Sequence, residues 1–155
     1  MNRYDLIVIG SGPSGSRTAS LCSGCGMSVI LIDKQIHPRP KCCAGGLLER
    51  AIKQLDRLPS SCIERELDSF IMFQGKESIQ CKMGRRVGIT VKRDIFDAHL
   101  AAEAERKGTE IIEGLTVESV RESDDGVTIR IEGENIESRF LVLAEGSKGK
   151  LSSQI

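Results

Sequence analysis

Three glycines and an acidic residue are spaced in this sequence so that together they could bind a phosphorylated nucleotide. Gly10-Ser-Gly12-Pro-Ser-Gly15 fits the pattern G-x-G-x-x-G after one apolar run, and Asp33 ends the next such run. The first glycine permits a tight turn, the second lets the backbone approach a pyrophosphate, and the third allows close packing of a helix on a strand. A carboxylate at Asp33 can accept hydrogen bonds from ribose hydroxyls. The pattern therefore predicts a dinucleotide site.

The acid at position 33 narrows the choice of nucleotide. A 2′-phosphate would face Asp33 as a second anion in a partly buried site, which argues against NADP. The glycines themselves leave FAD and NAD open. Pro13, Ser14 and Lys34 flank the predicted contacts, and we include them in the cofactor-binding set.

The glycine pattern needs a strand before it and a helix after it, and both are predicted. Residues 5–10 and 28–33 each contain a continuous apolar run rich in β-branched residues, as in buried parallel strands. Pro13 suits the first turn of a helix that extends to about Cys22. Residues 5–33 are therefore expected to form a parallel, right-handed strand–helix–strand unit.

The rest of the chain predicts short strands, one long helix and a meander. Residues 116–121 and 127–131 alternate apolar and polar side chains on either side of an Asp-Asp-Gly turn, which is typical of a hairpin. Helices are expected over 47–55 and 93–107, and further strands over 69–73, 78–81, 87–91, 109–112 and 136–144. The predicted fold class is α/β: a Rossmann-like, doubly wound sheet with an inserted β-meander.

Three later segments carry patterns of their own. Lys41-Cys-Cys-Ala-Gly-Gly-Leu47 resembles the K-x-C-(G/A)-G-G-L segment of the geranylgeranyl reductase family. Val91 to Leu100 resembles the V-x-R-x-x-F-D-x-x-L segment of the wider flavoprotein group that includes aromatic hydroxylases and halogenases. Phe140 to Ser152 resembles the A-D-G-x-x-S strand end of that group. The segments occur in family order, so the resemblance covers residues 1–155 as the N-terminal part of an FAD/NAD(P)-binding domain.

The resemblance implies that the cofactor is FAD and assigns roles to individual positions. It implies that the ADP half contacts Gly10, Gly12, Gly15 and Asp33. Arg93 would lie against the cofactor, where a guanidinium suits a phosphate or ribitol oxygen. A strand ending at Glu145-Gly146 would pass beneath the cofactor. The resemblance also places four residues close to the flavin ring: Cys43, Ala44, Gly45 and Gly46. Among them, Cys43 is the candidate catalytic residue.

Two departures from the family pattern affect these expectations. Glu145 stands where the family has Asp, one methylene farther from the backbone. The family also continues to a G-D motif and a substrate domain that this sequence does not contain, so the predicted sheet is incomplete at its C-terminus. The apolar strand 140–144 is then expected to be a bare edge, which favours aggregation.

By resemblance, the chain derives from an FAD-dependent oxidoreductase that reduces C=C bonds of an isoprenoid chain with hydride from reduced flavin. NAD(P)H or a ferredoxin-like protein would supply the electrons, and the family's lipid substrates imply peripheral membrane contact. Two alternatives remain open: a flavin monooxygenase or halogenase-like enzyme, and an inactive, truncated FAD-binding fragment.

Composition excludes several other classes. Twenty-two basic residues balance 22 acidic ones and there is no Trp, which argues against a nucleic-acid surface. No apolar run is long enough to span a membrane or serve as an export signal, so a cytoplasmic location and reduced cysteines are expected.

Other reactive side chains favour plainer roles. Cys22 and Cys25 fall at the end of the predicted helix, where the helix dipole opposes a thiolate, and no second ligand pair suggests zinc. His37 and His99 are isolated, and Asp97 is expected to fix a helix start.

Overall fold

A computed structural model of the chain describes residues 3–147 and 149–153. The chain divides into two compact units, one formed by residues 1–39 and 97–155 and the other by residues 40–96. We describe each unit separately, and call them the nucleotide unit and the insert unit.

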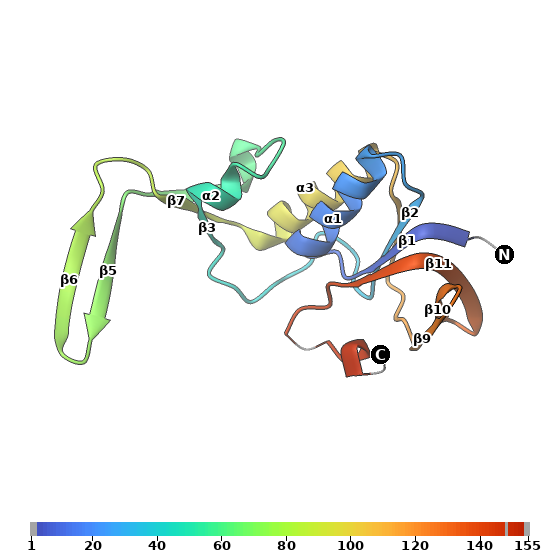
Figure 1. The fold of residues 1–155 in the computed structure, drawn as a ribbon. Helices are drawn as coiled ribbons and strands as arrows, with labels where there is room; N and C mark the ends of the chain where they lie inside the picture. Colours follow the sequence, from blue (N-terminus) through green and yellow to red (C-terminus); the bar gives the residue numbers. More distant parts are fainter. Residues whose placement is uncertain (1–2, 148, 154–155) are drawn as a thin grey trace. The chain divides into compact units, whose positions relative to one another are not determined.

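A mixed six-stranded sheet forms the centre of the nucleotide unit (Figure 1). Its strand order is β8-β2-β1-β11-β10-β9. The first four strands run parallel, whereas β9, β10 and β11 form an antiparallel meander that continues the sheet. Their bounds are β1 Arg3–Ile9, β2 Val29–Asp33, β8 Glu110–Glu113, β9 Ser119–Ser123, β10 Gly126–Ile131 and β11 Glu134–Leu143.

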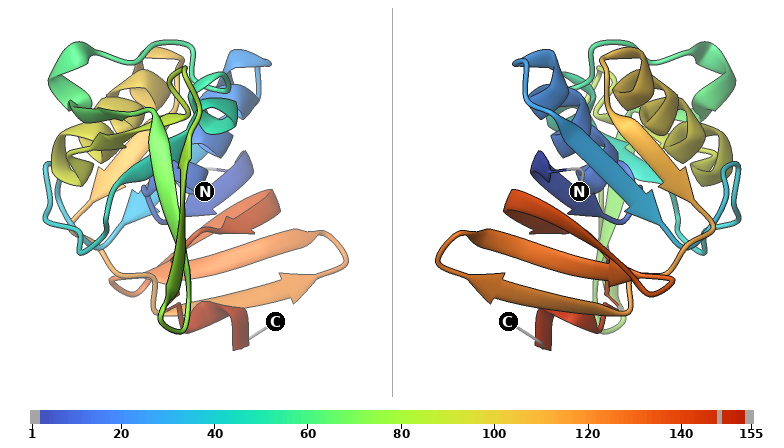
Figure 2. Two further views of the ribbon diagram at one scale, coloured as in Figure 1. Left: turned by 90° about the vertical axis from the view of Figure 1, so that its left-hand side faces the viewer. Right: turned by 90° about the vertical axis from the view of Figure 1, so that its right-hand side faces the viewer.

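Alternate side chains of β1 and β2 point to opposite faces of the sheet, and on these two strands both faces are buried. On one face, Leu6, Val8, Val29 and Leu31 pack with alanines of the two helices α1 (Pro13–Gly24) and α3 (Arg93–Arg106). Figure 2 shows both helices on that side of the parallel strands. On the other face, Ile7, Ile9, Ile30 and Ile32 pack with residues of the meander and with Leu151 of the 3₁₀ turn η2 (Leu151–Ser153). Buried on both sides, β1 and β2 show the continuous apolar runs read from the sequence.

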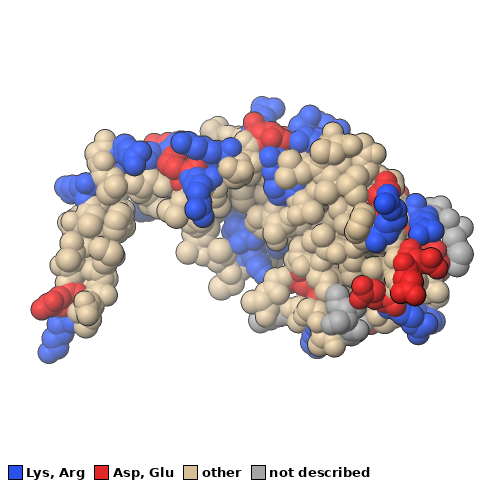
Figure 3. All heavy atoms as spheres, in the orientation of Figure 1, with Lys and Arg blue, Asp and Glu red and all other residues tan. Residues whose placement is uncertain are grey.

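The insert unit contains two small antiparallel sheets, with strand orders β3-β7-β4 and β5-β6. Its elements are β3 Gly46–Leu48, α2 Glu49–Ile52, the 3₁₀ turn η1 Ser60–Cys62, β4 Ile63–Leu67, β5 Ser69–Gln74, β6 Glu77–Lys82 and β7 Gly88–Val91. The β5–β6 hairpin exposes large apolar side chains, among them Phe73 at 74% and Ile79 at 63%. In Figure 3 its visible face is uncharged along most of its length.

Most of the predicted elements are confirmed, including the α/β class, the strand–helix–strand unit, the long helix and the meander. The helix predicted over 47–55 is wrong. Residues 46–48 instead form β3, which pairs with β7, and only one helical turn follows as α2. Strand pairing overrides a local pattern of leucines, alanine and isoleucine that suits a helix. Strand β4 was not predicted.

The prediction that residues 140–144 form a bare edge needs correction. β11 lies between β1 and β10, so it is an inner strand of the sheet. However, β10 pairs with β11 only as far as Ser138, whereas β1 pairs with it as far as Leu143. The half of β11 from Phe140 to Leu143 is therefore paired on one side only among the described strands, and Phe140 is 54% exposed.

Candidate functional site

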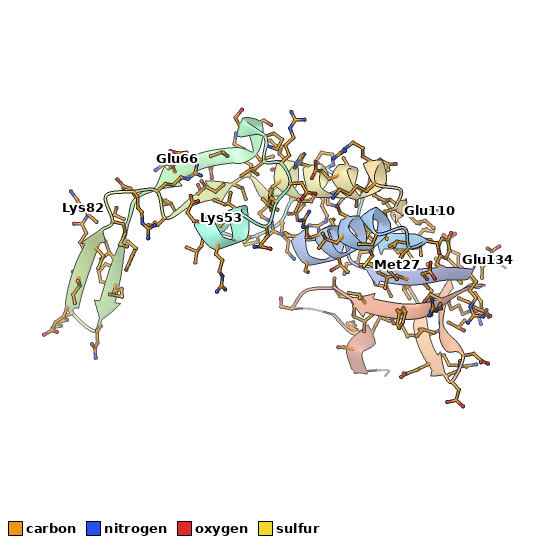
Figure 4. All side chains as sticks on the ribbon, turned by 45° about the horizontal axis from the view of Figure 1, so that its top comes forward. Met27, Lys53, Glu66, Lys82, Glu110 and Glu134 are labelled. Atoms are coloured by element: carbon orange, nitrogen blue, oxygen red, sulfur yellow. The ribbon has the colours of Figure 1, made fainter. Side chains whose placement is uncertain are left out.

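The carboxyl ends of the parallel strands meet at one end of the nucleotide unit and carry the predicted residues. β1 leads into Gly10, β2 ends at Asp33, and β11 leads into Glu145. The strands β8 and β11 begin at Glu110 and Glu134, which lie at the opposite end of the sheet (Figure 4). β1 has β2 on one side and β11 on the other, which is the switch point where ligands bind in open α/β sheets.

Each glycine of the G-x-G-x-x-G pattern meets a different steric demand. Gly10 has a φ of +102°, and a Cβ there would overlap the main-chain oxygen of Ala144. A Cβ on Gly15 would overlap the carbonyl oxygen of Gly10, so α1 can approach β1 only without that atom. At Gly12 the nearest atom to an added Cβ is a nitrogen of Arg39, 3.9 Å away. The space over Gly12 is therefore open to a ligand.

The amino end of α1 presents main-chain donors next to that space. Gly12 is the N-cap residue and Pro13 begins the helix, as expected, and none of the described side chains makes a capping hydrogen bond to the first turn. The N–H groups of a first helical turn have no partner within the helix, and the helix dipole makes this end positive. A pyrophosphate suits such a position.

Asp33 is held by three hydrogen bonds at the end of β2. Its Oδ2 accepts from the main-chain N–H and from the hydroxyl of Ser11, each at 2.7 Å, and its Oδ1 accepts from the N–H of Gln35 at 2.9 Å. Burial on its own would raise the pKa of Asp33, but these hydrogen bonds and the charge of Arg39 outweigh it and hold the pKa below its ordinary value. Asp33 is therefore an anion that only accepts hydrogen bonds.

Arg39 is a site residue that the sequence analysis missed. It is 7% exposed, and its guanidinium lies 3.4 Å from Oδ2 of Asp97 and 3.9 Å from Oδ2 of Asp33. Its position beside Gly12 gives the glycine loop a cationic neighbour suited to a phosphate. Arg39 lies outside the motifs of the sequence, and only the fold brings Asp97 to it.

Asp97 differs from its expected role. It is the fifth residue of α3, not a residue at its start, and its side chain is fully buried against Arg39. His37 is likewise not isolated, since its Nε2 lies 2.6 Å from the hydroxyl of Ser11.

A cleft of about 470 Å³ opens at the same end of the sheet. Its lining includes Gly10, Asp33, Lys34 and Glu145 from the predicted set, and the segment 115–118 after β8. The segment 115–118 was not predicted, because only the parallel pairing of β8 with β2 brings it beside Asp33. The volume falls within the range of about 300–1,000 Å³ typical of small-molecule sites.

Glu145 and Gly146 follow β11. Oε2 of Glu145 accepts a hydrogen bond from the N–H of Leu151 at 3.1 Å, which ties η2 to the end of β11. The longer carboxylate of Glu145 therefore still accepts a hydrogen bond from the main chain, in this case from Leu151. Gly146 has a φ of +77° and open space around it.

The remaining predicted residues lie in the insert unit. The N–H of Gly45 points to Sγ of Cys43 at 3.4 Å, and the N–H of Val91 donates to the carbonyl oxygen of Gly45 at 2.9 Å. Cys43 and Ala44 are exposed, and Gly46 begins β3. Arg93 begins α3 and is half-buried. Proximity of these residues to a flavin remains a prediction.

The nucleotide unit fits the ADP half of FAD: a glycine loop without side-chain obstruction, an uncapped helix end, a buried Arg and an ionised acid. Within the described residues, no group of three or more His, Cys, Asp or Glu could hold a metal ion. No helix in that part of the chain is both long and apolar enough to cross a membrane.

This combination of sheet order and glycine loop defines a dinucleotide-binding α/β protein. The sequence matches the FAD binding domain family over residues 3–155, and the chain belongs to that family.

Three known proteins show which members it is similar to. A probable electron transfer flavoprotein-quinone oxidoreductase of Escherichia coli is 32% identical over 97% of this chain and 37% of its own length. Digeranylgeranylglycerophospholipid reductase 2 of Methanosphaera stadtmanae is 28% identical over 97% of this chain and 41% of its own. A solved geranylgeranyl bacteriochlorophyll reductase-like protein of Thermoplasma acidophilum superposes with a TM-score of 0.88, at 25% identity, over 99% of this chain and 42% of its own.

These similarities confirm the family resemblance read from the three sequence segments. The chain spans about 40% of the length of the relatives it matches.

The contribution of Asp33 to stability is expected to depend on pH. Because its folded-state pKa is depressed, the stabilisation is present above its ordinary pKa of about 4 and is lost as pH falls through the lower folded value. Asp33→Asn should lower the free energy of unfolding at neutral pH by about 2 kcal/mol. Urea unfolding of both proteins between about pH 7 and pH 3 should show the difference shrinking only at the acid end.

Asp124→Asn, on the exposed turn between β9 and β10, is the matched control and should change stability little at any of these pH values. A difference between wild type and Asp33→Asn that stays constant down to the lowest pH would contradict the expected role of the ionised carboxylate.

Proposed function

We propose that the chain is the FAD-binding part of an oxidoreductase that reduces C=C bonds of an isoprenoid lipid. The observation that carries the cofactor assignment is the glycine loop beside a cleft that contains an ionised Asp33. Similarity to a digeranylgeranylglycerophospholipid reductase supports the substrate class.

The chain's own residues would hold the cofactor at defined points. The N–H groups of the first turn of α1 and the guanidinium of Arg39 would neutralise the pyrophosphate. Asp33 would accept from the adenosine ribose, and segment 115–118 would flank the adenine. Bound and reduced, FAD supplies a hydride to a carbon–carbon double bond. Cys43 to Gly46 are the proposed neighbours of the flavin ring, with Cys43 as the candidate catalytic residue.

The binding test is a titration of the purified chain with FAD, followed by the flavin fluorescence and the visible spectrum. We expect saturable binding that ADP displaces and NADP⁺ does not, because a 2′-phosphate would face the Asp33 carboxylate. Replacing Gly12 by Glu, which fills the open space over the loop with an anion, should abolish binding. An unchanged flavin spectrum at saturating FAD would overturn the cofactor proposal.

The substrate is tested in the longest polypeptide that contains this sequence. With FAD and dithionite as electron source, digeranylgeranylglyceryl phospholipid should gain two hydrogens per reduced double bond, measured by mass spectrometry.

Reduction of a soluble quinone without change in the lipid would instead favour an electron-transfer function like that named for the Escherichia coli relative. Consumption of oxygen with NAD(P)H and an aromatic substrate would favour a monooxygenase. NAD(P)H or a ferredoxin-like protein as natural electron donor belongs to the same proposal. Contact with a membrane surface belongs to it as well, because the proposed substrate is a lipid.

A further inference from the structure

A chain of polar side chains, two of them buried and one half-buried, connects the loop that follows β1 with the end of β2 and the segment after it. Nε2 of His37 lies 2.6 Å from Oγ of Ser11, and Ser11 donates from that oxygen to Oδ2 of Asp33 at 2.7 Å. The side chains of Ser11 and Asp33 are buried, at 0% and 8% exposure. The three residues thus link the glycine loop, the end of β2 and the segment after it.

Counting hydrogens fixes the direction of this chain. A serine hydroxyl has one hydrogen, and here it goes to the Asp33 carboxylate, which only accepts. The remaining contact of Ser11 must then receive a hydrogen from His37, so Nε2 of the imidazole carries the proton. By occupying a lone pair of the hydroxyl oxygen, His37 directs the hydroxyl hydrogen toward Asp33.

The position of His37 is itself held from another strand. Its main-chain N–H donates to Oε1 of Glu113, the last residue of β8, at 3.2 Å. Its Nδ1 is buried and has no hydrogen-bond partner within the described ranges. A buried acceptor without a partner lowers stability, so packing alone does not explain why a histidine occupies this position.

The carboxylate of Asp33 has few acceptor positions left for a ligand. A carboxylate offers about four lone-pair sites, and the two donors of Ser11 and the N–H of Gln35 use three of them. Oδ1 has the remaining site, and Asp33 lines the cleft. The orientation of the carboxylate therefore decides whether that site meets a ribose hydroxyl.

We propose that His37 is a positioning residue which, through Ser11, holds Asp33 in the orientation that recognises a hydroxyl of the adenosine ribose. The inference rests on the proposed binding of an adenine dinucleotide and adds the residues that set its ribose specificity. His37 does not touch the nucleotide in this scheme. Its effect is on specificity: it raises the affinity for ligands that have the ribose hydroxyls relative to the affinity for ligands that lack them.

The test compares two probes, ADP and 2′,3′-dideoxyadenosine diphosphate, by isothermal titration calorimetry. Gln places an amide N–H near the position of imidazole Nε2, whereas Met has a similar volume and no donor. Wild type and His37→Gln should prefer ADP. His37→Met should lose about three- to tenfold in ADP affinity, the range for one hydrogen bond, with unchanged affinity for the dideoxy probe.

Ser11→Ala removes the hydroxyl with little change in volume. It should lower ADP affinity as His37→Met does and leave affinity for the dideoxy probe unchanged. This variant tests the inference even where a variant of His37 folds poorly. Thermal unfolding of each variant verifies the folded state.

Equal losses for both probes in His37→Met, or a wild-type preference retained in it, would overturn the inference while FAD binding stands. The expected ratios together with no lipid reduction would overturn the proposed function alone. A wild-type chain that binds neither probe would overturn both.

Discussion

Replacing Gly15 by alanine is expected to destabilise the nucleotide unit by about 3 kcal/mol, the upper range for overpacking. A Cβ at this position would overlap the main-chain oxygen of Gly10 and lie 3.2 Å from the Cβ of Ala144. Neither neighbour can rotate away, because one is backbone and the other is a single methyl group. α1 would have to move from β1, which would also remove its amino end from a bound pyrophosphate. Urea unfolding and FAD titration measure the two effects.

The same helix provides the control. A Cβ on Gly24 would meet only Cδ of Lys107, at an ordinary contact distance of 3.6 Å. Gly24→Ala should therefore keep FAD affinity and leave stability unchanged or raise it by up to about 1 kcal/mol, since alanine favours helix. Similar losses in both variants would show that a general intolerance of α1 to side chains, and not the contact with Gly10, is responsible.

Removing the carboxylate of Asp97 is expected to cost about 3 kcal/mol in unfolding free energy. Asp97→Ala would leave the buried guanidinium of Arg39 without its partner at 3.4 Å, and the carboxylate of Asp33 at 3.9 Å compensates only in part. The charge cannot escape by losing a proton, because arginine stays protonated. Chemical denaturation of the purified variant measures the loss.

Two further variants test whether the loss in Asp97→Ala comes from leaving the buried charge of Arg39 unpaired. In Arg39→Met/Asp97→Leu both charges are gone, so most of the stability should return while FAD affinity falls. Arg130→Ala breaks an ion pair with Glu118 at 3.5 Å in which both side chains are about half exposed, and should cost no more than about 1 kcal/mol. A double variant as unstable as Asp97→Ala would contradict the argument that the unpaired buried charge is the cause.

The proposed contacts to FAD are divided between the two units of the chain. The nucleotide unit carries the proposed contacts to the ADP half of FAD, whereas Cys43 to Gly46 and Arg93 belong to the insert unit. The predicted FAD/NAD(P)-binding domain over 1–155 therefore includes both units. Binding of FAD, compared with binding of ADP, would measure what the insert unit contributes.

Local patterns in the sequence were sufficient for most of the elements and for the glycine loop. Continuous apolar runs predicted β1 and β2, because strands covered on both faces have no polar side. The three glycines and Asp33 predicted the nucleotide site, because their demands are met within one strand–helix–strand unit. Helix α3 was expected over 93–107, and the β9–β10 hairpin followed from alternating side chains on either side of a short turn. These features depend on residues close together in the chain.

Only the tertiary structure decided the features that depend on distant partners. Residues 46–48 became a strand because β7 offers hydrogen bonds that a helix pattern does not reveal. Arg39 and Asp97 form a pair because the chain returns through α3 to the glycine loop. His37 reaches Ser11, and 115–118 reaches Asp33, because parallel pairing places the ends of three strands side by side. Sequence spacing sets which residues can be neighbours along one element, whereas the order of strands in the sheet sets which elements meet.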